Sequence, residues 1–388
     1  KIILVSGTLV SLVMTRESAT RSTLAYTMNA GDGIAEVSLD TSRDLAGNDI
    51  VATPTAGATF DLDNTAPTLS NLELVSTNEK DGTRYAKSGD DLTLTFSSSE
   101  AIPAPTVTLA GTSVTATDTS SGAQTSWQAI HPVADGDSGD VSFTISYADA
   151  AGNPGGEVTA PDAGNQITMD TTAPTLPEVS LSSNNPLDTS LAKATETVTL
   201  TVRSQEPLHS LTLVKPDDST KPLDPVGSEG TQWTLSKTIE TGDNGPLEFR
   251  LRYTDLAGNS GEEVTSTTDE TEVSMDTTAP EISSVSIVSN NADTGYGKHD
   301  DTVTLTFMTD EPVRDLAAAD LEIEGLANLS VRSLNDEKTQ WEATGVVDED
   351  LVEASQSGGG GGASTAVFRI TVLDNAGNRG SPKTTTTD

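Results

Sequence analysis

The pentapeptide Asp44-Leu-Ala-Gly-Asn48 recurs three times with only its second residue free to change, as Asp149–Asn153, Asp255–Asn259 and Asp374–Asn378. Aspartate and asparagine side chains hydrogen-bond nearby backbone groups, and glycine adopts a positive φ without steric cost, so each copy predicts a tight turn. Four copies of one turn in a single chain indicate internal repetition.

A second signature, an aspartate followed closely by Thr-Ala-Pro, lies between successive copies of the first. Its prolines are Pro67, Pro174 and Pro280, separated by 107 and 106 residues. A fixed period found twice predicts tandem copies of one domain. We therefore expect complete domains at 65–171, 172–277 and 278–388, and we interpret 1–64 as the C-terminal half of a further domain.

Alternating apolar and polar residues predict that these domains are built from half-buried strands. The clearest cases are 91–96, 197–202 and 302–307. Further strands are predicted at 23–28, 141–147, 247–253 and 367–372, and about seven short strands per repeat favour an all-β sandwich. Each repeat also has one tryptophan, which we expect to pack between the sheets as a core anchor; the three are Trp127, Trp233 and Trp341.

The composition restricts the partners that the chain can have. The 388 residues include 59 Asp and Glu against 21 Lys and Arg, a net charge of −38. The acidic excess extends over all four segments. Such a field repels nucleic acid and anionic membrane surfaces and concentrates cations, so we expect no nucleic-acid binding and no direct membrane insertion of this segment. The chain has no cysteine, whereas a secreted eukaryotic β-domain of this size would often carry disulfides; a protein of a reducing compartment or of a bacterial surface needs none.

The four signatures in fixed order resemble a known family. Thr-Ala-Pro opens each repeat, a glutamate turn follows the second strand (Ser99-Glu100, Glu206-Pro207, Glu311-Pro312), a tryptophan lies in mid-repeat and Asp-Xaa-Ala-Gly-Asn closes it. This order resembles the bacterial Ig-like repeats of giant surface adhesins, including the repeats-in-toxin type. The resemblance implies Greek-key Ig-like β-sandwiches arranged end to end, with calcium at the domain junctions.

The order of strands in a sandwich predicts where acidic residues meet. The second and sixth strands end at the pole of the domain that receives the linker, so each linker aspartate should meet a glutamate and the aspartate of the pentapeptide. Three carboxylates then offer the hard oxygen ligands that Ca²⁺ prefers. The predicted ligand sets are Asp63, Glu100 and Asp149; Asp170, Glu206 and Asp255; and Asp276, Glu311 and Asp374.

Loops at the opposite pole of the preceding domain are expected to add further carboxylates, at Asp32, Asp135, Asp137 and Asp243. The alternative is that the pentapeptides are turns alone and that Thr-Ala-Pro is a linker whose proline directs the chain. Turn chemistry explains Asp149, but it requires neither Glu100 nor Asp63. The calcium interpretation and the turn interpretation therefore both stand at this point.

The sequence offers no pattern typical of an enzyme. The histidines, His131, His209 and His299, occupy different places in their repeats, and no pair of carboxylates is singled out for catalysis. The glycine run at 358–362 lacks the Lys and Ser/Thr of a phosphate-binding loop. We expect no enzymatic activity.

Two classes of function remain. The first is a structural extender of a bacterial cell-surface or secreted adhesin, outside the cell, in which tandem repeats stiffened by calcium project a ligand-binding tip, as in adhesion and biofilm formation. The second is a glycan- or protein-binding module, or the subunit of a filament in which the incomplete first domain associates with a second copy by sharing a strand. The uniform spacing of the repeats favours the extender.

Overall fold

The chain forms two compact units. The structure is a computed structural model, and it describes residues 2–4, 9–10, 14–27, 31–37, 43–44, 46–49, 59–80, 83–159, 166–215, 219–226, 229–348 and 367–387. One unit comprises Lys1–Thr172 together with Leu256–Asn259, and the other comprises Ala173–Asp255 together with Ser260–Asp388. Within the described ranges, no helix has the length and apolar character needed to cross a membrane.

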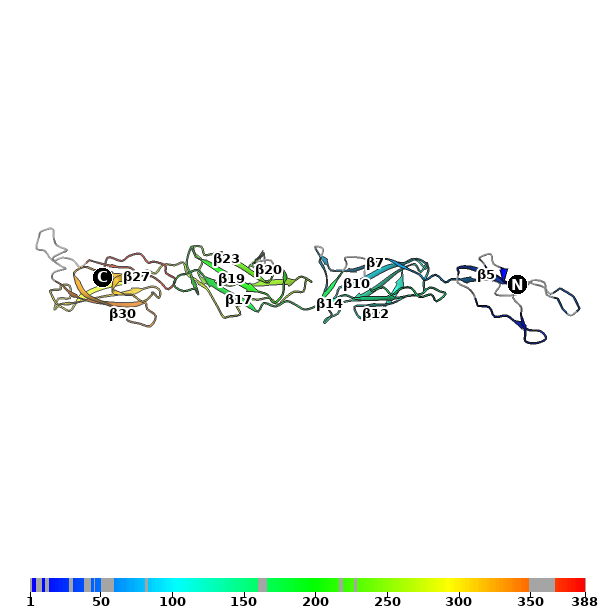
Figure 1. The fold of residues 1–388 in the computed structure, drawn as a ribbon. Coiled ribbons are helices and arrows are strands. Elements are labelled where there is room, and N and C mark those ends of the chain that lie inside the picture. The colour runs from blue at the N-terminus through cyan, green and yellow to red at the C-terminus, as the bar shows by residue number, and fades with distance from the viewer. Residues whose placement is uncertain are drawn as a thin grey trace. The chain divides into compact units, whose positions relative to one another are not determined.

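The N-terminal segment of the first unit contains one small antiparallel sheet and a short hairpin (Figure 1). The sheet has the order β2-β1-β5-β6, and the hairpin joins β3 to β4. The strands are β1 (Ile2–Leu4), β2 (Leu9–Val10), β3 (Thr15–Arg16), β4 (Ser22–Thr23), β5 (Gly33–Val37) and β6 (Thr59–Leu62). Strand β6 leads directly into the first linker, which begins at Asp63.

Two sheets that enclose one core follow in the same unit. Their strand orders are β15-β11-β12-β13-β10-β7 and β14-β16-β9-β8. The strands are β7 (Leu69–Ser76), β8 (Glu79–Lys80), β9 (Thr83–Ala86), β10 (Asp91–Ser98), β11 (Thr106–Leu109), β12 (Thr112–Asp118), β13 (Ser126–Pro132), β14 (Ser138–Asp140), β15 (Phe143–Ser146) and β16 (Thr168–Asp170).

The second unit contains two further sets of sheets, each around a core of its own. Its first set of sheets has the orders β17-β19-β23-β22, β21-β20-β25 and β18-β26-β24, and its second set has β27-β28-β31-β30 and β29-β32. The elements are β17 (Glu178–Ser183), β18 (Leu191–Ala192), β19 (Thr197–Arg203), β20 (Leu208–Val214), β21 (Thr220–Pro222), β22 (Asp224–Pro225), β23 (Gln232–Thr238), β24 (Gly245–Pro246), β25 (Leu251–Asp255), β26 (Ser274–Met275), β27 (Ile282–Ser289), β28 (Thr302–Thr309), the 3-10 helix η1 (Ala318–Asp320), β29 (Leu321–Ile323), β30 (Leu326–Ser333), β31 (Gln340–Val347) and β32 (Phe368–Ile370).

The protein is therefore all-β, with Ig-like sandwiches in tandem. The clearest strands predicted from alternation, at 91–96, 197–202 and 302–307, are confirmed as β10, β19 and β28. In β10 every second side chain is buried, and β19 shows the same pattern. Three hydrophobic core clusters lie within 72–169, 176–275 and 285–372, one in each predicted complete repeat. The exact boundaries of four domains stay a prediction.

The tryptophans are core anchors, as predicted. Trp127, Trp233 and Trp341 are exposed to only 3%, 6% and 2%, respectively. Each pairs across the sheet with an apolar residue of the second long strand, for example Trp341 with Phe307. This burial leaves their ring faces unavailable for stacking on a sugar.

Some strand predictions were wrong. In the run 247–253, residues 247–250 are not in a strand. The strand β25 begins only at Leu251 and continues to Asp255. Likewise Val141 and Ser142 separate β14 from β15. Of residues 23–27 only Thr23 is in a strand, and Met28 lies outside the described residues. Strand β30, which pairs with β31 around a bulge between Ala327 and Ser330, was not predicted, although its Leu329 and Val331 pack against the core of the last repeat. The glycine run at 358–362 lies outside the described residues.

Candidate metal centres

Three acidic side chains converge at the first linker. Asp63 follows β6, Glu100 lies in the turn after β10, and Asp149 begins the pentapeptide loop after β15. One carboxylate oxygen from each lies within 4.8 Å of those of the other two. Residues separated by up to 86 positions in sequence thus form one cluster, which we call the first acid cluster.

An equivalent group, the last acid cluster, lies in the second unit. It consists of Asp276, Glu311 and Asp374, whose carboxylate oxygens also lie within 4.8 Å of one another. Asp374 is exposed to only 1% and Asp149 of the first cluster to 4%, so in both clusters the pentapeptide aspartate is the buried member.

The middle set of predicted ligands is divided between the two compact units. Asp170 belongs to the first unit, and Glu206 and Asp255 belong to the second. Asp255 is buried, with 1% exposure, as its counterparts are. Asp170 caps its linker as Asp63 does, because its Oδ1 accepts a hydrogen bond of 3.0 Å from the amide of Thr172.

The pentapeptide has the turn chemistry that its sequence predicts. In the last copy, Asp374 Oδ1 accepts a bond of 2.8 Å from the Asn378 amide, and Asp374 Oδ2 accepts one of 2.7 Å from Asn378 Nδ2. The glycine between them, Gly377, has a φ of 87°, which an L side chain adopts only with strain. The aspartate is thereby oriented by its own loop, and its oxygens retain lone pairs for a further partner.

The asparagine of the pentapeptide also holds the linker. Asn153 Nδ2 donates to the Asp63 carbonyl at 3.0 Å and Asn378 Nδ2 donates to the Asp276 carbonyl at 2.9 Å. Asn259 makes the corresponding bond to Asp170, at 2.8 Å. Sequence reasoning gave this residue only a turn role, although its recurrence in all four copies was a signal that it does more.

A hydroxyl group fixes the glutamate of each cluster. Ser98 Oγ donates to the Glu100 carbonyl at 2.6 Å, and Thr309 Oγ1 donates to the Glu311 carbonyl at 2.7 Å. The turn after the second long strand is thus closed by a bond between residues two positions apart. The segment that carries each acid of a cluster is therefore fixed by a hydrogen bond between residues two to four positions apart.

The clusters are electrostatically strained. Burial, together with the charges of Asp276, Asp374 and Asp310, raises the pKa of Glu311 to about 7. Burial and the neighbouring Asp374 also raise the pKa of Asp276. Like charges at this distance disfavour ionisation of one another.

The first cluster shows the same effect in a more exposed setting. The pKa of Glu100 is raised by desolvation and by the charges of Asp63, Asp149 and Asp32. Burial opposes ionisation of Asp149, but hydrogen bonds from Asn153 and Gly152 hold the pKa of that carboxyl below its ordinary value. The glutamate pKa is therefore raised in both clusters.

The donor atoms suit a divalent cation of the calcium type. Three carboxylates supply up to six hard oxygen ligands, and Ca²⁺ takes six to eight at 2.3–2.6 Å. In the last cluster Glu311 Oε1 is buried and has no hydrogen-bond partner in the described part of the chain. A cation among these oxygens would supply the missing partner and neutralise the mutual repulsion.

Of the four acids expected to add further carboxylates to the clusters, only Asp32 is seen to act on one. Asp32 lies near the first cluster, since its charge acts on Glu100 and its carboxylate accepts bonds from the Asn64 amide and the Thr65 hydroxyl, at 2.8 and 2.5 Å. Asp137 instead caps its own turn at Ala134, and Asp243 pairs with Lys237. Neither these two nor Asp135 belongs to a group of carboxylates that the described residues bring together. Asp137 is therefore held by its own turn, and Asp243 by its own turn together with the Lys237 ammonium group.

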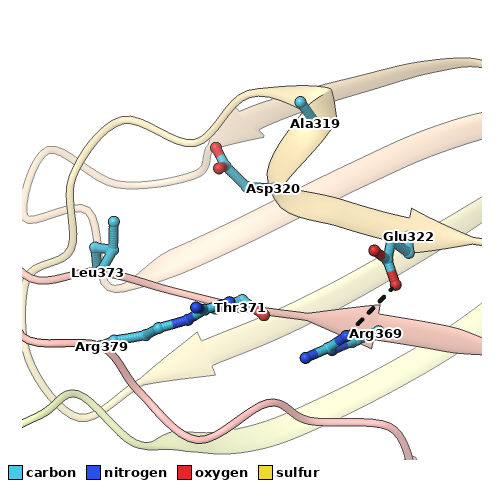
Figure 2. Close-up of a pocket in the computed structure, with 7 residues that line it drawn as sticks. All are labelled: Ala319, Asp320, Glu322, Arg369, Thr371, Leu373 and Arg379. Carbon is cyan, nitrogen blue, oxygen red and sulfur yellow. Dashed lines mark ion pairs between the residues drawn. The ribbon is translucent and has the colours of Figure 1, made fainter.

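A separate surface hollow lies on the last repeat (Figure 2). It combines two arginines with two acids, and Arg369 pairs with Glu322 at 4.0 Å. Its lining residues are Ala319, Asp320, Glu322, Arg369, Thr371, Leu373 and Arg379. No counterpart of Arg379 exists in the earlier repeats, where Pro154 and Ser260 follow the pentapeptide.

Comparisons with known proteins gave matches among solved structures. No family model and no curated protein matches the chain. A calcium-stabilised adhesin with which an Antarctic bacterium binds ice is 19% identical, over 90% of this chain and 79% of that one, with a TM-score of 0.35. The three-Ig ectodomain of mouse nectin-like molecule 4 is 12% identical over 78% and 96%, with a TM-score of 0.28. A tandem segment of titin is 9% identical over 80% and 97%, with a TM-score of 0.25. Likeness at this level carries no conclusion about function.

Proposed function

We propose that this chain is a structural extender of a bacterial adhesin, located outside the cell or on its surface, whose Ig-like repeats are stiffened by calcium at their linkers. The observation that carries the proposal is the recurrence of one acid cluster at the linker positions of Asp63 and Asp276. A binding or catalytic site would need to exist once, whereas a device that sets the geometry between consecutive repeats is needed at every linker.

The residues around each cluster suggest how a cation would act. The linker aspartate, the glutamate turn and the pentapeptide loop come from three separate segments, so a cation shared by Asp276, Glu311 and Asp374 would join all three. Without it the carboxylates repel one another. Bound calcium would convert that repulsion into attraction and restrict bending of the chain at the linker.

Calcium affinity would make this stiffening specific to the exterior of the cell. Extracellular modules commonly bind Ca²⁺ with dissociation constants of about 10⁻⁴ to 10⁻³ M. Sites in that range fill in seawater or host fluids and remain empty at cytoplasmic calcium levels. The partners of each repeat would then be the neighbouring repeats of the same chain.

Calcium binding and small-angle scattering test the proposal together. We expect titration calorimetry to detect Ca²⁺ binding by the wild type. In small-angle scattering, the range of radii of gyration needed to fit the data should be narrower with millimolar calcium than with chelator. The double variant Asp276→Asn with Glu311→Gln should lose about one bound ion. The control, Glu324→Gln with Asp336→Asn, makes the same charge change on exposed acids of that repeat and should retain it. Identical titrations and scattering with and without calcium in the wild type would leave the clusters as turns only.

The hollow around Arg369 and Arg379 favours one alternative, a glycan- or protein-binding role for the last repeat. Arg379 has no counterpart in the preceding two repeats, and both arginines are exposed in an otherwise acidic chain. Arg379→Ser, which restores the residue found at position 260, should abolish ligand capture on a glycan array under this alternative. The extender proposal expects no specific capture by the wild type.

A further inference from the structure

A loop that combines an asparagine, a lysine and an acid recurs with the period of the repeats, outside the acid clusters. Two copies, separated by 107 residues as the first two linker prolines are, are Asn78 with Lys87 and Asp90, and Asn185 with Lys193 and Glu196. In both copies the lysine amide donates to the acid three residues later, at 2.8 and 2.9 Å. We call them the first and second docking loops.

Asn185 organises the second docking loop. Its Oδ1 accepts bonds from the amides of Leu187 and Asp188, at 2.8 and 3.2 Å, and its Nδ2 donates to Glu196 Oε2 at 3.0 Å. The same Glu196 oxygen accepts the bond from the Lys193 amide. Asn185 and Glu196 are exposed to only 3% and 9%. These local bonds hold the Asn185 side chain in one orientation.

The second docking loop binds the backbone of the last pentapeptide. Asn185 Nδ2 donates to the Ala376 carbonyl, and Lys193 Nζ donates to the Gly377 carbonyl, both at 2.8 Å. The loop and the pentapeptide belong to the same compact unit. The lysine bond is charge-assisted, which makes it stronger than a bond between neutral groups. Neither bond involves a carboxylate of the last acid cluster, so this contact needs no cation.

The contact also restricts the sequence of its ligand. Ala376 is exposed to only 1%, so a longer side chain at that position would meet neighbouring atoms. A Cβ on Gly377 would lie 2.9 Å from Leu187 Cδ1 and 3.1 Å from Lys193 Nζ. Gly377 therefore meets two requirements, since it also has the positive φ of the turn. The second docking loop thus recognises two carbonyls together with the small residues that carry them.

The first docking loop makes the same kind of contact. Asn78 Nδ2 donates to the Ala257 carbonyl at 2.6 Å, and Ala257 is exposed to 1%. The Lys87 side chain lies over Gly258, with its Cε 3.8 Å from a Cβ built there. These four residues belong to one compact unit. The two docking loops are therefore two examples of one mode of recognition.

We propose that the second docking loop is a recognition site for the Ala-Gly backbone of the last pentapeptide, and that it keeps the two sandwiches of the second compact unit docked when no cation is bound. Under that condition the carboxylates of the last acid cluster repel one another. The docking loop opposes their repulsion at the same pentapeptide, through Asn185 and Lys193. Calcium and the docking loop are separate devices, and this proposal does not rest on the calcium proposal.

Distance measurements between two spin labels test the proposal in the presence of chelator. The chain has no cysteine, so Thr238→Cys in β23 and Ser330→Cys in β30 place one label on each sandwich, at exposed positions. With no other substitution we expect a single narrow distribution of distances. A broad distribution in chelator would overturn the proposal.

Substitutions in the docking loop separate its bonds from the effect of the linker. Lys193→Met keeps the apolar stem and the backbone bond to Glu196 but removes the ammonium group, so the undocked fraction should rise about tenfold. Asn185→Ala should act similarly, and the double variant should give a broad distribution. Lys221→Met, the same change at an exposed lysine of that sandwich, should leave the distribution narrow. A double variant as narrow as the wild type would show that the docking loop does not hold the sandwiches.

A substitution in the pentapeptide tests the ligand. Gly377→Ala should broaden the distribution, because its Cβ would meet Leu187 and Lys193. Gly258→Ala places the same residue in a turn of nearly equal φ, 86° against 87°, at the first docking loop, and should leave this distribution narrow. Broadening counts as undocking only where thermal unfolding shows that both sandwiches remain folded. A wild type that binds no calcium but keeps a narrow distribution would contradict the calcium proposal and support this one.

Discussion

The first and last acid clusters share their residue types and the order of those residues along the chain, yet their environments differ. The pKa of Glu311 reaches about 7 because burial adds to the charges of Asp276, Asp374 and Asp310. Glu100 experiences the same kinds of effect in a more solvated position, and its pKa shift is smaller. One motif therefore yields two sites of different electrostatic strain, and the difference comes from packing and not from ligand identity.

The largest expected effect is the loss of the last acid cluster, while the first is retained, when the last repeat is unfolded. Trp341 pairs with Phe307 on β28, the strand that precedes Glu311, and is exposed to 2%. Trp341→Ala should cost about 3 to 5 kcal/mol and disrupt the last cluster. Chemical denaturation combined with calcium titration measures both effects. The first cluster, which lies over a different core, should keep its ion; loss of both ions would show that the cores are coupled.

Bound calcium should reduce the difference in electrostatic repulsion between the two clusters, because it neutralises the carboxylates of both. At a free concentration one hundred times the dissociation constant, each ion stabilises its folded repeat by about 2.7 kcal/mol. We expect two separate thermal transitions to rise when calcium replaces chelator. Asp63→Asn with Glu100→Gln should remove the increase from one transition only. An increase that persists in both transitions would place the ions elsewhere.

In the presence of chelator, the stability of the repeat that carries the last cluster should depend on pH more strongly than that of the repeat that carries the first. The folded-state pKa of Glu311 is above the unfolded value of 4.5, so the folded state binds more protons between pH 4.5 and about 7. Stability should therefore fall as the pH rises through that window, by on the order of 1 to 2 kcal/mol once solvent screening is considered. Denaturation curves at several pH values measure the slope. Glu311→Gln should flatten it, whereas Glu100→Gln should change it less.

The smallest expected effect concerns the glycines of the two loops. Gly152 and Gly377 both have positive φ, at 98° and 87°. A Cβ on Gly152 meets no atom within 4 Å, but one on Gly377 would lie 2.9 Å from Leu187 Cδ1 and 3.1 Å from Lys193 Nζ. Both alanine variants should lose about 1 kcal/mol to backbone strain, and Gly377→Ala should lose about 1 kcal/mol more to the contact. Equal losses in thermal unfolding would mean that the Leu187 side chain moves aside freely.

The sequence by itself determined the features that depend on local chemistry. Alternation placed β10, β19 and β28, since side chains of a strand point to opposite faces with a period of two. The pentapeptide predicted its own turn through the short reach of Asp and Asn. The period of the prolines and tryptophans predicted repeated sandwiches, and strand order alone predicted that Glu100 would approach Asp63 and Asp149.

Only the tertiary structure decided the features that depend on distant segments. The bond from Asn185 to Ala376 joins residues 191 positions apart, and nothing local to either residue requires it. The raised pKa of Glu311 depends on how deeply its turn is buried. The motif does not predict this depth, because Glu100 lies in a cluster of the same residue types. Strand β30 takes its place beside β31, where its Leu329 and Val331 pack against the core of the last repeat, because that distant neighbouring strand supplies its hydrogen bonds.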